Sequence, residues 1–329
     1  MWYSGEAAPI DRIELPPVRH ATAAARERVL VLLASRNGAR WIRQQLASIL
    51  AQEGVEVRVA VRDDGSTDTT LRELAAFTAG QRVRLSPLSA PTGAAAQNFL
   101  ALIVENPADE FDYVAFSDQD DIWRADKLAR ACRMLSLKRA AGYSSATIAV
   151  WPDGSTAALR QANAVTSADF LFEGAGQGCT FVLRAQFYAR VRRFVREHHA
   201  LMRGIHYHDW MVYALARSWG ESWTFDSRPS VSYRQHQDND TGARTHLAGT
   251  RKRLTLIRSG WYRGQLEAIA AICAAAAPAS AVVARWRSLL TAKRSWRRRL
   301  RIASFCLSRG RRRRLDNLVL VCAAMAGWI

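Results

Sequence analysis

The sequence of 329 residues lacks any apolar run of the roughly 20 residues that a membrane-spanning helix requires. The longest candidate, residues 317–329, falls short of that length. The first 20 residues have neither a basic start nor an apolar centre, so we expect no secretory signal there. Apolar residues make up 49% of the chain and charged residues 23%, which excludes a disordered or collagen-like protein.

Cysteine is scarce as well, and the five cysteines lie far apart in the sequence: Cys132, Cys179, Cys273, Cys306 and Cys322. They lack the paired spacing of a disulfide framework or a zinc site, which predicts reduced thiols in a cytoplasmic protein. The histidines His206 and His208 do not have the spacing of a helical metal pair either, so zinc is not expected.

Acidic residues are almost absent from the C-terminal quarter of the chain. The whole chain has 47 Lys and Arg against 29 Asp and Glu, a formal net charge of +18. Residues 251–329 contain 18 of those basic residues and only two acids, Glu267 and Asp316. We expect the nearly neutral part to hold the fold and the chemistry, and the basic part to contact an anionic surface.

Segments typical of strands and of helices alternate in the first half of the chain. The predicted strands are apolar runs of strand length: 29–33, 55–61 and 111–116. The predicted helices have apolar residues on one face: 42–50, 92–104 and 124–137. This alternation predicts an α/β fold with a mainly parallel sheet flanked by helices, whose ligands bind at the carboxyl ends of the strands.

The composition also predicts a division of the chain into three parts. Residues 1–27 contain three prolines and no periodic pattern, which is typical of a loose leader. Residues 28–245 are expected to form the catalytic domain. Residues 246–329 are expected to form a basic helical region.

Three carboxylates follow the last of these predicted strands, in the segment Ser117-Asp118-Gln119-Asp120-Asp121. Repulsion between such groups is tolerable only beside a cation or in solvent. Alternate residues of an extended backbone point the same way, so Asp118 and Asp120 could share one divalent ion while Asp121 points elsewhere. The alternative is a solvated acidic turn that caps the following helix.

A second acidic cluster, Asp63-Asp64-Gly65-Ser66, follows the strand at 55–61. A carboxylate at this point can accept hydrogen bonds from the imide N–H of a pyrimidine base or from a ribose hydroxyl, and Gly65 permits the tight turn that such an approach needs. The alternative is a turn that caps a helix.

Five segments occur in an order and approximate spacing that resemble the motifs of family 2 glycosyltransferases, and in particular their rhamnosyltransferase-like branch. They are Val31 to Gly38, Arg62 to Ser66, Phe116 to Trp123, His208 to Trp210 and Tyr233 to His236. The likeness covers about residues 28–245. It implies a GT-A fold and the transfer of a sugar from a nucleotide diphosphate donor with inversion at the anomeric carbon.

The resemblance implies roles on the donor side of the site. Ser35 and Asn37 would lie beside the nucleotide base, and Asp64 would contact the base or the ribose. Arg36 departs from the family pattern, since many relatives have an aromatic residue there, and its basic side chain could instead reach a phosphate.

The resemblance also implies the groups that carry the reaction. Asp118 and Asp120 would hold Mg²⁺ or Mn²⁺ on the donor diphosphate, and His236 would complete the metal shell or contact the diphosphate. Asp209 occupies the position of the catalytic base, where the helix dipole would keep a carboxylate ionised. The alternative for Asp209 is a plain helix N-cap.

The acceptor side is predicted from weaker signals. Gly178, Cys179 and Thr180 lie in a glycine-rich segment that in the resembled family faces the acceptor cleft, and Trp123 lies two residues after the acidic cluster. The segment lacks the lysine of a phosphate-binding loop. Its alternative is a flexible strand entry, with Cys179 a small buried residue.

The basic region carries apolar residues roughly along one stripe: Val282, Trp286, Leu289, Leu290, Trp296, Leu300, Ala303 and Leu307. Arginines and lysines crowd the remaining surface, as in helices that lie on anionic lipid. Residues 311–314 are all arginine and precede a short apolar end that could dip into a bilayer. The alternatives are nucleic-acid binding, for which no accompanying motif is present, and a solvated helix packed on the catalytic domain.

Together these patterns predict a metal-dependent, inverting glycosyltransferase that moves a sugar, plausibly L-rhamnose, to a hydroxyl of a cell-surface glycan or a lipid-linked acceptor. We expect a cytoplasmic enzyme held peripherally on the inner face of the cell membrane, and no nucleic-acid partner. The alternatives are a nucleotidyltransferase acting on sugar phosphates and a non-catalytic basic adaptor for membranes or nucleic acids.

Overall fold

The computed structural model describes residues 26–87, 90–161, 165–236 and 255–329. The predicted leader lies outside the described residues up to residue 25, and its last residue, Glu27, already belongs to the first strand. The first part of the predicted basic region, 246–254, also lies outside them. Every residue predicted to belong to the site is described.

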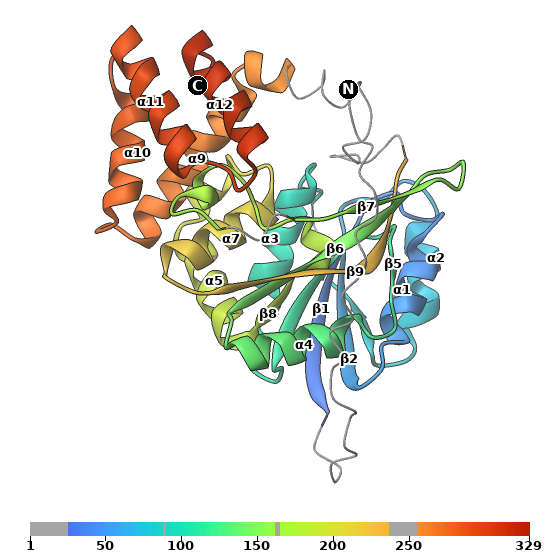
Figure 1. Cartoon of the computed structure of the whole chain (residues 1–329). Coiled ribbons are helices and arrows are strands. Elements are labelled where there is room, and N and C mark those ends of the chain that lie inside the picture. The colour runs from blue at the N-terminus through green and yellow to red at the C-terminus, as the bar shows by residue number, and fades with distance from the viewer. Residues whose placement is uncertain (1–25, 88–89, 162–164, 237–254) are drawn as a thin grey trace, which may run out of the picture.

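A nine-stranded mixed sheet forms the centre of the described part of the molecule (Figure 1). The strands are β1 (Glu27–Ser35), β2 (Val55–Asp63), β3 (Val83–Leu85), β4 (Tyr113–Ser117), β5 (Ile122–Trp123), β6 (Gly142–Val150), β7 (Thr156–Leu159), β8 (Val182–Arg184) and β9 (Trp223–Arg234). Their order is β3-β2-β1-β4-β8-β6-β9-β5, with β7 paired to β6. Strands β3, β2, β1 and β4 are mutually parallel, whereas β8 is antiparallel to both of its neighbours, β4 and β6. The predicted α/β fold is confirmed, with antiparallel strands added to a parallel half.

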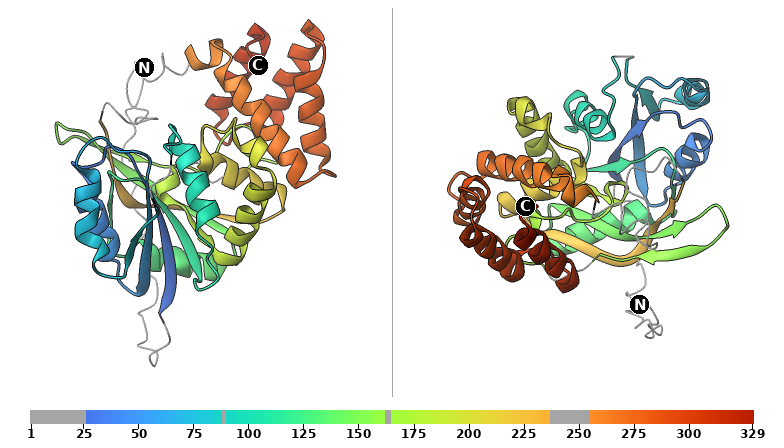
Figure 2. Two further views of the ribbon diagram at one scale, coloured as in Figure 1. Left: turned by 180° about the vertical axis from the view of Figure 1, so that it is seen from behind. Right: turned by 90° about the horizontal axis from the view of Figure 1, so that it is seen from above.

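Helices cover both faces of this sheet (Figure 2). The helices before the basic region are α1 (Ile42–Leu50), α2 (Thr70–Thr78), α3 (Ala95–Glu105), α4 (Lys127–Lys138), α5 (Ala185–Glu197), α6 (His199–Met202) and α7 (His208–Ser218). Val31 and Leu33 of β1 are buried with α1, α2 and α4, whereas Leu30 and Leu32 are buried with α3, α5 and α7. Successive side chains of a strand point to opposite faces, so the continuous apolar run of β1 creates two cores.

The strand register aligns the polar ends of the parallel strands. Ser35 of β1 pairs with Asp63 of β2, and Leu33 pairs with Ser117 of β4. The loops that follow these three strands therefore leave the sheet at the same edge, where ligands of such sheets bind.

In the described residues 261–329, four further helices pack beside α7 (Figure 1). They are α9 (Trp261–Ala276), α10 (Ala281–Thr291), α11 (Trp296–Arg309) and α12 (Arg314–Ala326). Their buried side chains join the core that contains α3, α5 and α7. Among the described helices, none combines the length and the apolar character that crossing a bilayer would need.

The predicted apolar stripe is divided between two of these helices. Trp286 and Leu290 of α10 are buried, and the Trp286 ring packs on the aromatic core. Trp296, Leu300 and Leu307 of α11 are exposed. The chain turns at 292–295 between α10 and α11, so a pattern that is continuous in sequence has one half facing the protein and the other facing solvent.

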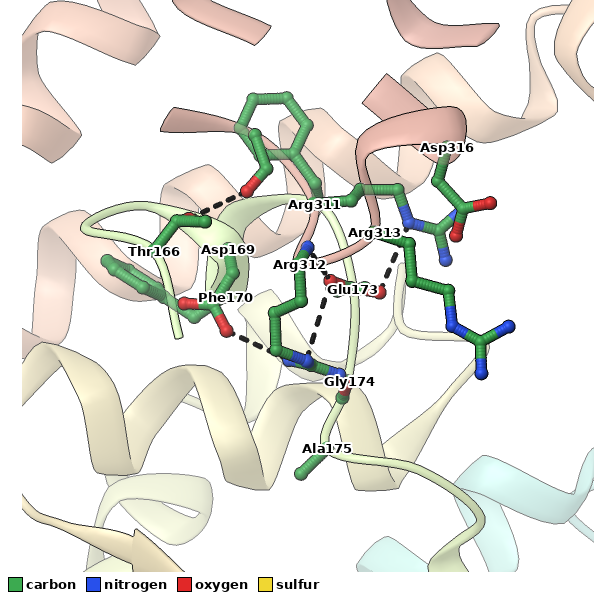
Figure 3. Close-up of polar contacts among 12 residues, drawn as sticks. Thr166, Asp169, Phe170, Glu173, Gly174, Ala175, Arg311, Arg312, Arg313 and Asp316 are labelled. Carbon is green, nitrogen blue, oxygen red and sulfur yellow. Dashed lines mark hydrogen bonds and ion pairs between the residues drawn. The ribbon is translucent and has the colours of Figure 1, made fainter. Parts of the chain in front are cut away.

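Arg312 fastens the C-terminal helices to the rest of the protein (Figure 3). Its side chain is 2% exposed, and its Nη1 donates to Asp169 Oδ2 at 2.8 Å while its Nη2 donates to the Gly174 carbonyl at 2.6 Å. Its backbone N–H donates to Glu173 Oε1 at 2.5 Å, and Arg311 Nε donates to Glu173 Oε2 at 3.3 Å.

The same network reaches α7. Asp169 Oδ2 accepts a second hydrogen bond from the Tyr213 hydroxyl at 2.6 Å, and Asp169 Oδ1 accepts from Arg217 Nη1 at 2.8 Å. Arg311 and Arg312 therefore neutralise carboxylates of the chain itself. Of the four consecutive arginines 311–314, these two therefore bind acids of the protein itself and are not available to an external anionic surface.

We predict that Arg312→Ala lowers the free energy of unfolding by about 3 kcal/mol, since it leaves a buried carboxylate with too little compensating charge. Arg314→Ala, at an exposed position two residues later, is the matched control and should change it by less than about 0.5 kcal/mol. Urea unfolding of the two variants measures both values. Equal stabilities would contradict a docking role for Arg312.

Candidate functional site

Gln119 joins the loop after β4 to the loop after β1. Its Oε1 accepts hydrogen bonds from Ser35 Oγ at 3.1 Å and from the Arg36 N–H at 2.8 Å, and its Nε2 donates to the Arg36 carbonyl at 2.7 Å. Gly38 leaves room for this amide, because a Cβ at Gly38 would lie 2.2 Å from Gln119 Oε1. The residue between Asp118 and Asp120 thus fixes the two loops together.

The loop after β1 is also tied to the loop after β2. Asn37 adopts a left-handed conformation with φ of 49°, which asparagine tolerates better than most residues. Its N–H donates to Ser66 Oγ at 2.8 Å, and its Oδ1 accepts from the Thr67 N–H at 2.8 Å. The Asp64 N–H donates to the Ser35 carbonyl at 2.8 Å. The structure therefore brings Ser35, Asn37 and Asp64 to one edge of the sheet, with Asn37 exposed and Ser35 buried.

Asp64 holds the segment before α3. Its Oδ1 accepts hydrogen bonds from the Thr92 N–H at 2.6 Å and from Arg62 Nη1 at 3.1 Å, and its Oδ2 accepts from the Gly93 N–H at 2.9 Å. Burial alone would raise the pKa of Asp64, but the hydrogen bonds from Thr92, Gly93 and Arg62 outweigh it and hold this pKa below its usual value. Asp64 is therefore a stable carboxylate whose oxygens are largely engaged by the protein.

Asp121 forms the floor of the acidic cluster. It is fully buried, and neither of its carboxylate oxygens has a hydrogen-bond partner among the described residues. Burial raises the pKa of Asp121 well above its usual value, and the charges of Asp120 and Asp118 raise it further. One oxygen of Asp118, one oxygen of Asp121 and the Cys179 Sγ all lie within 4.8 Å of one another. Buried oxygens in this arrangement fit a divalent cation.

The expectation that Asp121 points away from its neighbours is wrong. It relied on the alternation of side chains along an extended backbone, but β4 ends at Ser117 and the chain bends at 119–120. Cys179, which shares the cluster, is not suited to a hard cation. Burial raises the pKa of its thiol well above the usual value, so the sulfur stays protonated and the carboxylates remain the better ligands.

Asp120 binds His236 across the site. His236 Nε2 lies 2.8 Å from Asp120 Oδ2, and the imidazole stacks on the Trp41 ring with centroids 4.3 Å apart and an interplanar angle of 18°. Strand β9 pairs antiparallel with β5 and carries His236 just beyond its end. The structure thus joins two of the predicted metal-binding residues directly to each other.

Trp123 lies behind the acidic cluster, in the core. Its side chain is 3% exposed, and its ring lies 3.4 Å from the Nζ of the fully buried Lys127. Its ring faces the interior, and its place on the acceptor side stays a prediction. Burial lowers the pKa of Lys127 to about 7, an effect that nearby Cys179 and Asp121 oppose.

Asp209 lies in the first turn of α7, which begins at His208. The N-cap of this helix is Tyr207, so Asp209 does not fill that position. Asp209 Oδ1 accepts a hydrogen bond from the Trp210 N–H at 2.6 Å. Burial raises the pKa of Asp209 to about 6, although the N–H groups of Trp210 and Gly178 act in the opposite direction. A half-buried carboxylate of this kind is ionised near neutral pH and can accept a proton.

The short turn η2 (Gly178–Thr180) links the two carboxylate groups of the site. A Cβ at Gly178 would lie 3.2 Å from Asp209 Cβ and 2.9 Å from His208 Nε2, so only glycine allows α7 this close. The next residue, Cys179, lies beside Asp118 and Asp121. Cys179 and Thr180 are fully buried, and the acceptor-side role of this segment stays a prediction.

Sequence reasoning missed Gln119, Asp121 and Lys127 as parts of this site. Gln119 and Asp121 lie inside a recognised motif, but the bend that directs their side chains has no sequence signal. Trp123 ends β5 and Lys127 begins α4, so their contact depends on the turn between the two elements, for which the sequence has no signal.

Comparisons with known proteins identify the family of the chain. The family model described as glycosyl transferase family 2 matches residues 30–177. The chain is 37% identical to the dTDP-rhamnosyl transferase RfbG of Shigella flexneri over 240 residues. This match covers 72% of this chain and 83% of that protein.

Solved structures of S. aureus TarS have a similar fold. The fragment 1–349 in complex with UDP gives a TM-score of 0.55 at 14% identity, covering 92% of this chain and 89% of that one. The chain spans only 42% of the longer TarS structure, with a TM-score of 0.50. The expected GT-A fold is confirmed. The chain therefore belongs to glycosyl transferase family 2, as a nucleotide-sugar glycosyltransferase of the rhamnosyltransferase-like kind.

Proposed function

We propose that this enzyme transfers L-rhamnose from a dTDP-activated donor, with inversion at the anomeric carbon, to a hydroxyl of a cell-surface glycan or of a lipid-linked acceptor. The choice of donor rests on the similarity to the dTDP-rhamnosyl transferase RfbG. The reaction rests above all on one observation, that η2 lies between the acidic cluster and Asp209. Family membership favours sugar transfer over the nucleotidyltransferase and adaptor alternatives.

On the donor side, Asp118 and Asp120 would hold Mg²⁺ or Mn²⁺, with Asp121 beneath them. The two buried Asp121 oxygens have no hydrogen-bond partner among the described residues, so their lone pairs are available to a cation, which supports this site. When bound, such an ion neutralises the negative charge that develops on the departing nucleoside diphosphate. Because His236 Nε2 contacts Asp120, we propose that His236 orients this carboxylate. Side chains that hydrogen-bond to metal ligands commonly have this role.

The loops after β1 and β2 would receive the nucleotide. Asn37 is exposed and fixed by Ser66 and Thr67, so it presents a rigid edge toward a base. Ser35 and Asp64 are buried and hold the surrounding backbone, and Asp64 keeps one lone pair of Oδ2 for a ribose hydroxyl or a base N–H.

On the acceptor side, Asp209 would take the proton from the attacking hydroxyl. A carboxylate with a pKa of about 6 is a stronger base than an exposed aspartate, and it is still ionised at neutral pH. Gly178 packs against Asp209 without a side chain, and its N–H helps to keep the carboxylate ionised. Inversion requires attack from the face opposite the leaving group, so the base and the diphosphate-binding carboxylates have to lie on different sides of the sugar.

With dTDP-L-rhamnose and an acceptor, the wild-type enzyme should release dTDP and no pyrophosphate. Asp209→Asn should lower kcat by about 10²- to 10⁴-fold, because the amide cannot accept the proton. The wild-type rate should rise about tenfold per pH unit up to pH about 6 and level off above it, as Asp209 loses its proton. Asp109→Asn, at an exposed turn, is the matched control and should keep full activity. Pyrophosphate release, or an active Asp209→Asn enzyme, would refute the proposal.

Gly178→Ala should reduce kcat about tenfold or more, because the added Cβ pushes against His208 and Asp209 and displaces the base. Gly264→Ala in α9 is the matched control, since a Cβ there meets nothing within 4 Å. Steady-state kinetics and melting temperatures of both variants separate a displaced base from a destabilised fold. Unchanged kcat in Gly178→Ala would remove this contact from the mechanism.

Calorimetry should show binding of dTDP with Mn²⁺ that EDTA abolishes. His236→Phe keeps an aromatic ring on Trp41 but loses the bond to Asp120, and we expect the apparent Mn²⁺ affinity to fall about 10- to 100-fold. His199→Phe, at an exposed position, serves as the control and should bind Mn²⁺ as the wild type does. A His236→Phe enzyme with normal Mn²⁺ affinity would exclude the orienting role.

A further inference from the structure

Helix α12 presents an apolar face to solvent. Its members are Leu315, Leu318, Val319, Cys322 and Met325. Leu315 is 77% exposed, and Leu318 and Val319 are each about half exposed. Their spacing of three and four residues places them on one side of the helix, while the opposite side is buried in the core. Exposed apolar residues occur singly on most proteins, but a row along a whole helix marks an interaction site.

Helix α11 carries a second exposed apolar row. Trp296, Leu300 and Leu307 are exposed at spacings of four and seven residues. The two helices lie side by side (Figures 1 and 2), and Arg299 Nη1 of α11 donates to the Met325 carbonyl of α12 at 3.1 Å. We call the exposed apolar residues of α11 and α12 the docking face.

Exposed arginines surround the docking face: Arg297, Arg299, Arg301, Arg309, Arg313 and Arg314. The only acids in residues 251–329 are Glu267 and Asp316. Glu267 lies 2.8 Å from Arg263, and Asp316 lies 3.7 Å from Arg311, so each acts chiefly on an arginine of its own. The surroundings of the docking face therefore carry an excess of positive charge.

We infer that the docking face binds the surface of an anionic lipid bilayer. The apolar side chains can enter the acyl region of such a surface, and the flanking arginines can bind its negative headgroups. A second copy of this chain is a poorer occupant, because two such faces would bring like charges together. Nucleic acid would satisfy the arginines but would leave the leucines in water.

The place of the docking face in the fold is consistent with this occupant. Both figures place α9 to α12 at the end of the sheet toward which β1 runs, which is the end that carries the site loops. An enzyme held on a bilayer by α11 and α12 would therefore have its site end near the lipid surface. The inference itself does not depend on the donor or on the reaction proposed above.

The test uses the full chain and sedimentation with vesicles. Wild-type protein should bind vesicles made of phosphatidylcholine and phosphatidylglycerol in equal parts, and should bind pure phosphatidylcholine vesicles at least about tenfold more weakly, since only the first attract the arginines. Leu315→Gln/Leu318→Gln should lower binding to the mixed vesicles about tenfold or more, because it removes two side chains from the acyl region. Leu137→Gln in α4 is the matched control, as Leu137 is also 71% exposed, and it should bind normally.

Two further readouts keep the result decisive. The leucine variants are at exposed positions, so their dTDP release with a water-soluble acceptor should match the wild type and report an intact fold. Cys322 is the exposed cysteine of the five, so a polarity-sensitive fluorophore can be attached there, and its emission should shift to the blue on adding mixed vesicles. The inference is overturned if Leu315→Gln/Leu318→Gln binds mixed vesicles as the wild type does, if the fluorophore stays in water, or if the leucine substitutions instead break a dimer.

Discussion

Repulsion among carboxylates at the end of β4 is the constraint around which the site is arranged. Asp118, Asp120 and Asp121 lie within four residues, and the protein gives them different surroundings. Asp120 faces an imidazole, whereas Asp121 is enclosed without a hydrogen bond from the described residues and has a raised pKa. The buried amine of Lys127 is too strongly desolvated to neutralise the cluster fully. A divalent cation bound at the proposed site would be attracted by the same carboxylate charges that disfavour folding in its absence.

Rigidity of the surrounding loops follows from hydrogen bonds between side chains and backbone. Gln119 holds Arg36, Asn37 holds Thr67, and Asp64 holds Thr92 and Gly93, so each loop is anchored on its neighbour. These contacts link the loops after β1, β2 and β4, and the two ends of the Gln119 amide are both engaged. Pre-positioned loops lose little conformational entropy when a nucleotide binds, which favours affinity without a large contact area.

The sequence predicted what depends on local pattern. Apolar runs located the buried strands such as β1, and the spacing of Asp118 from β4 placed it at the carboxyl edge of the sheet. What it could not predict depends on segments far apart in the chain or on local bends. Asp121 turns inward because the backbone bends at 119–120, and Gly178 meets Asp209 only after β8 and α5 have brought η2 to α7. The apolar stripe of the basic region was located in sequence, but its division between core and surface depends on the turn after α10.

Helix α7 connects the proposed catalytic base to the C-terminal helices. Asp209 lies in its first turn, while Tyr213 and Arg217 further along bind Asp169, which also binds Arg312 directly before α12. The buried charges make this connection stiff, because separating Arg312 from Asp169 would leave an uncompensated ion in a low-dielectric interior. A base that serves an acceptor at a surface has to stand at a fixed distance from it, since displacement by about 1 Å can lower a rate a hundredfold. The ion pairs between Asp169 of the protein body, Arg217 of α7 and Arg312 before α12 would hold the proposed base at such a fixed distance, which gives a physical reason for the burial of Arg312 in so basic a segment.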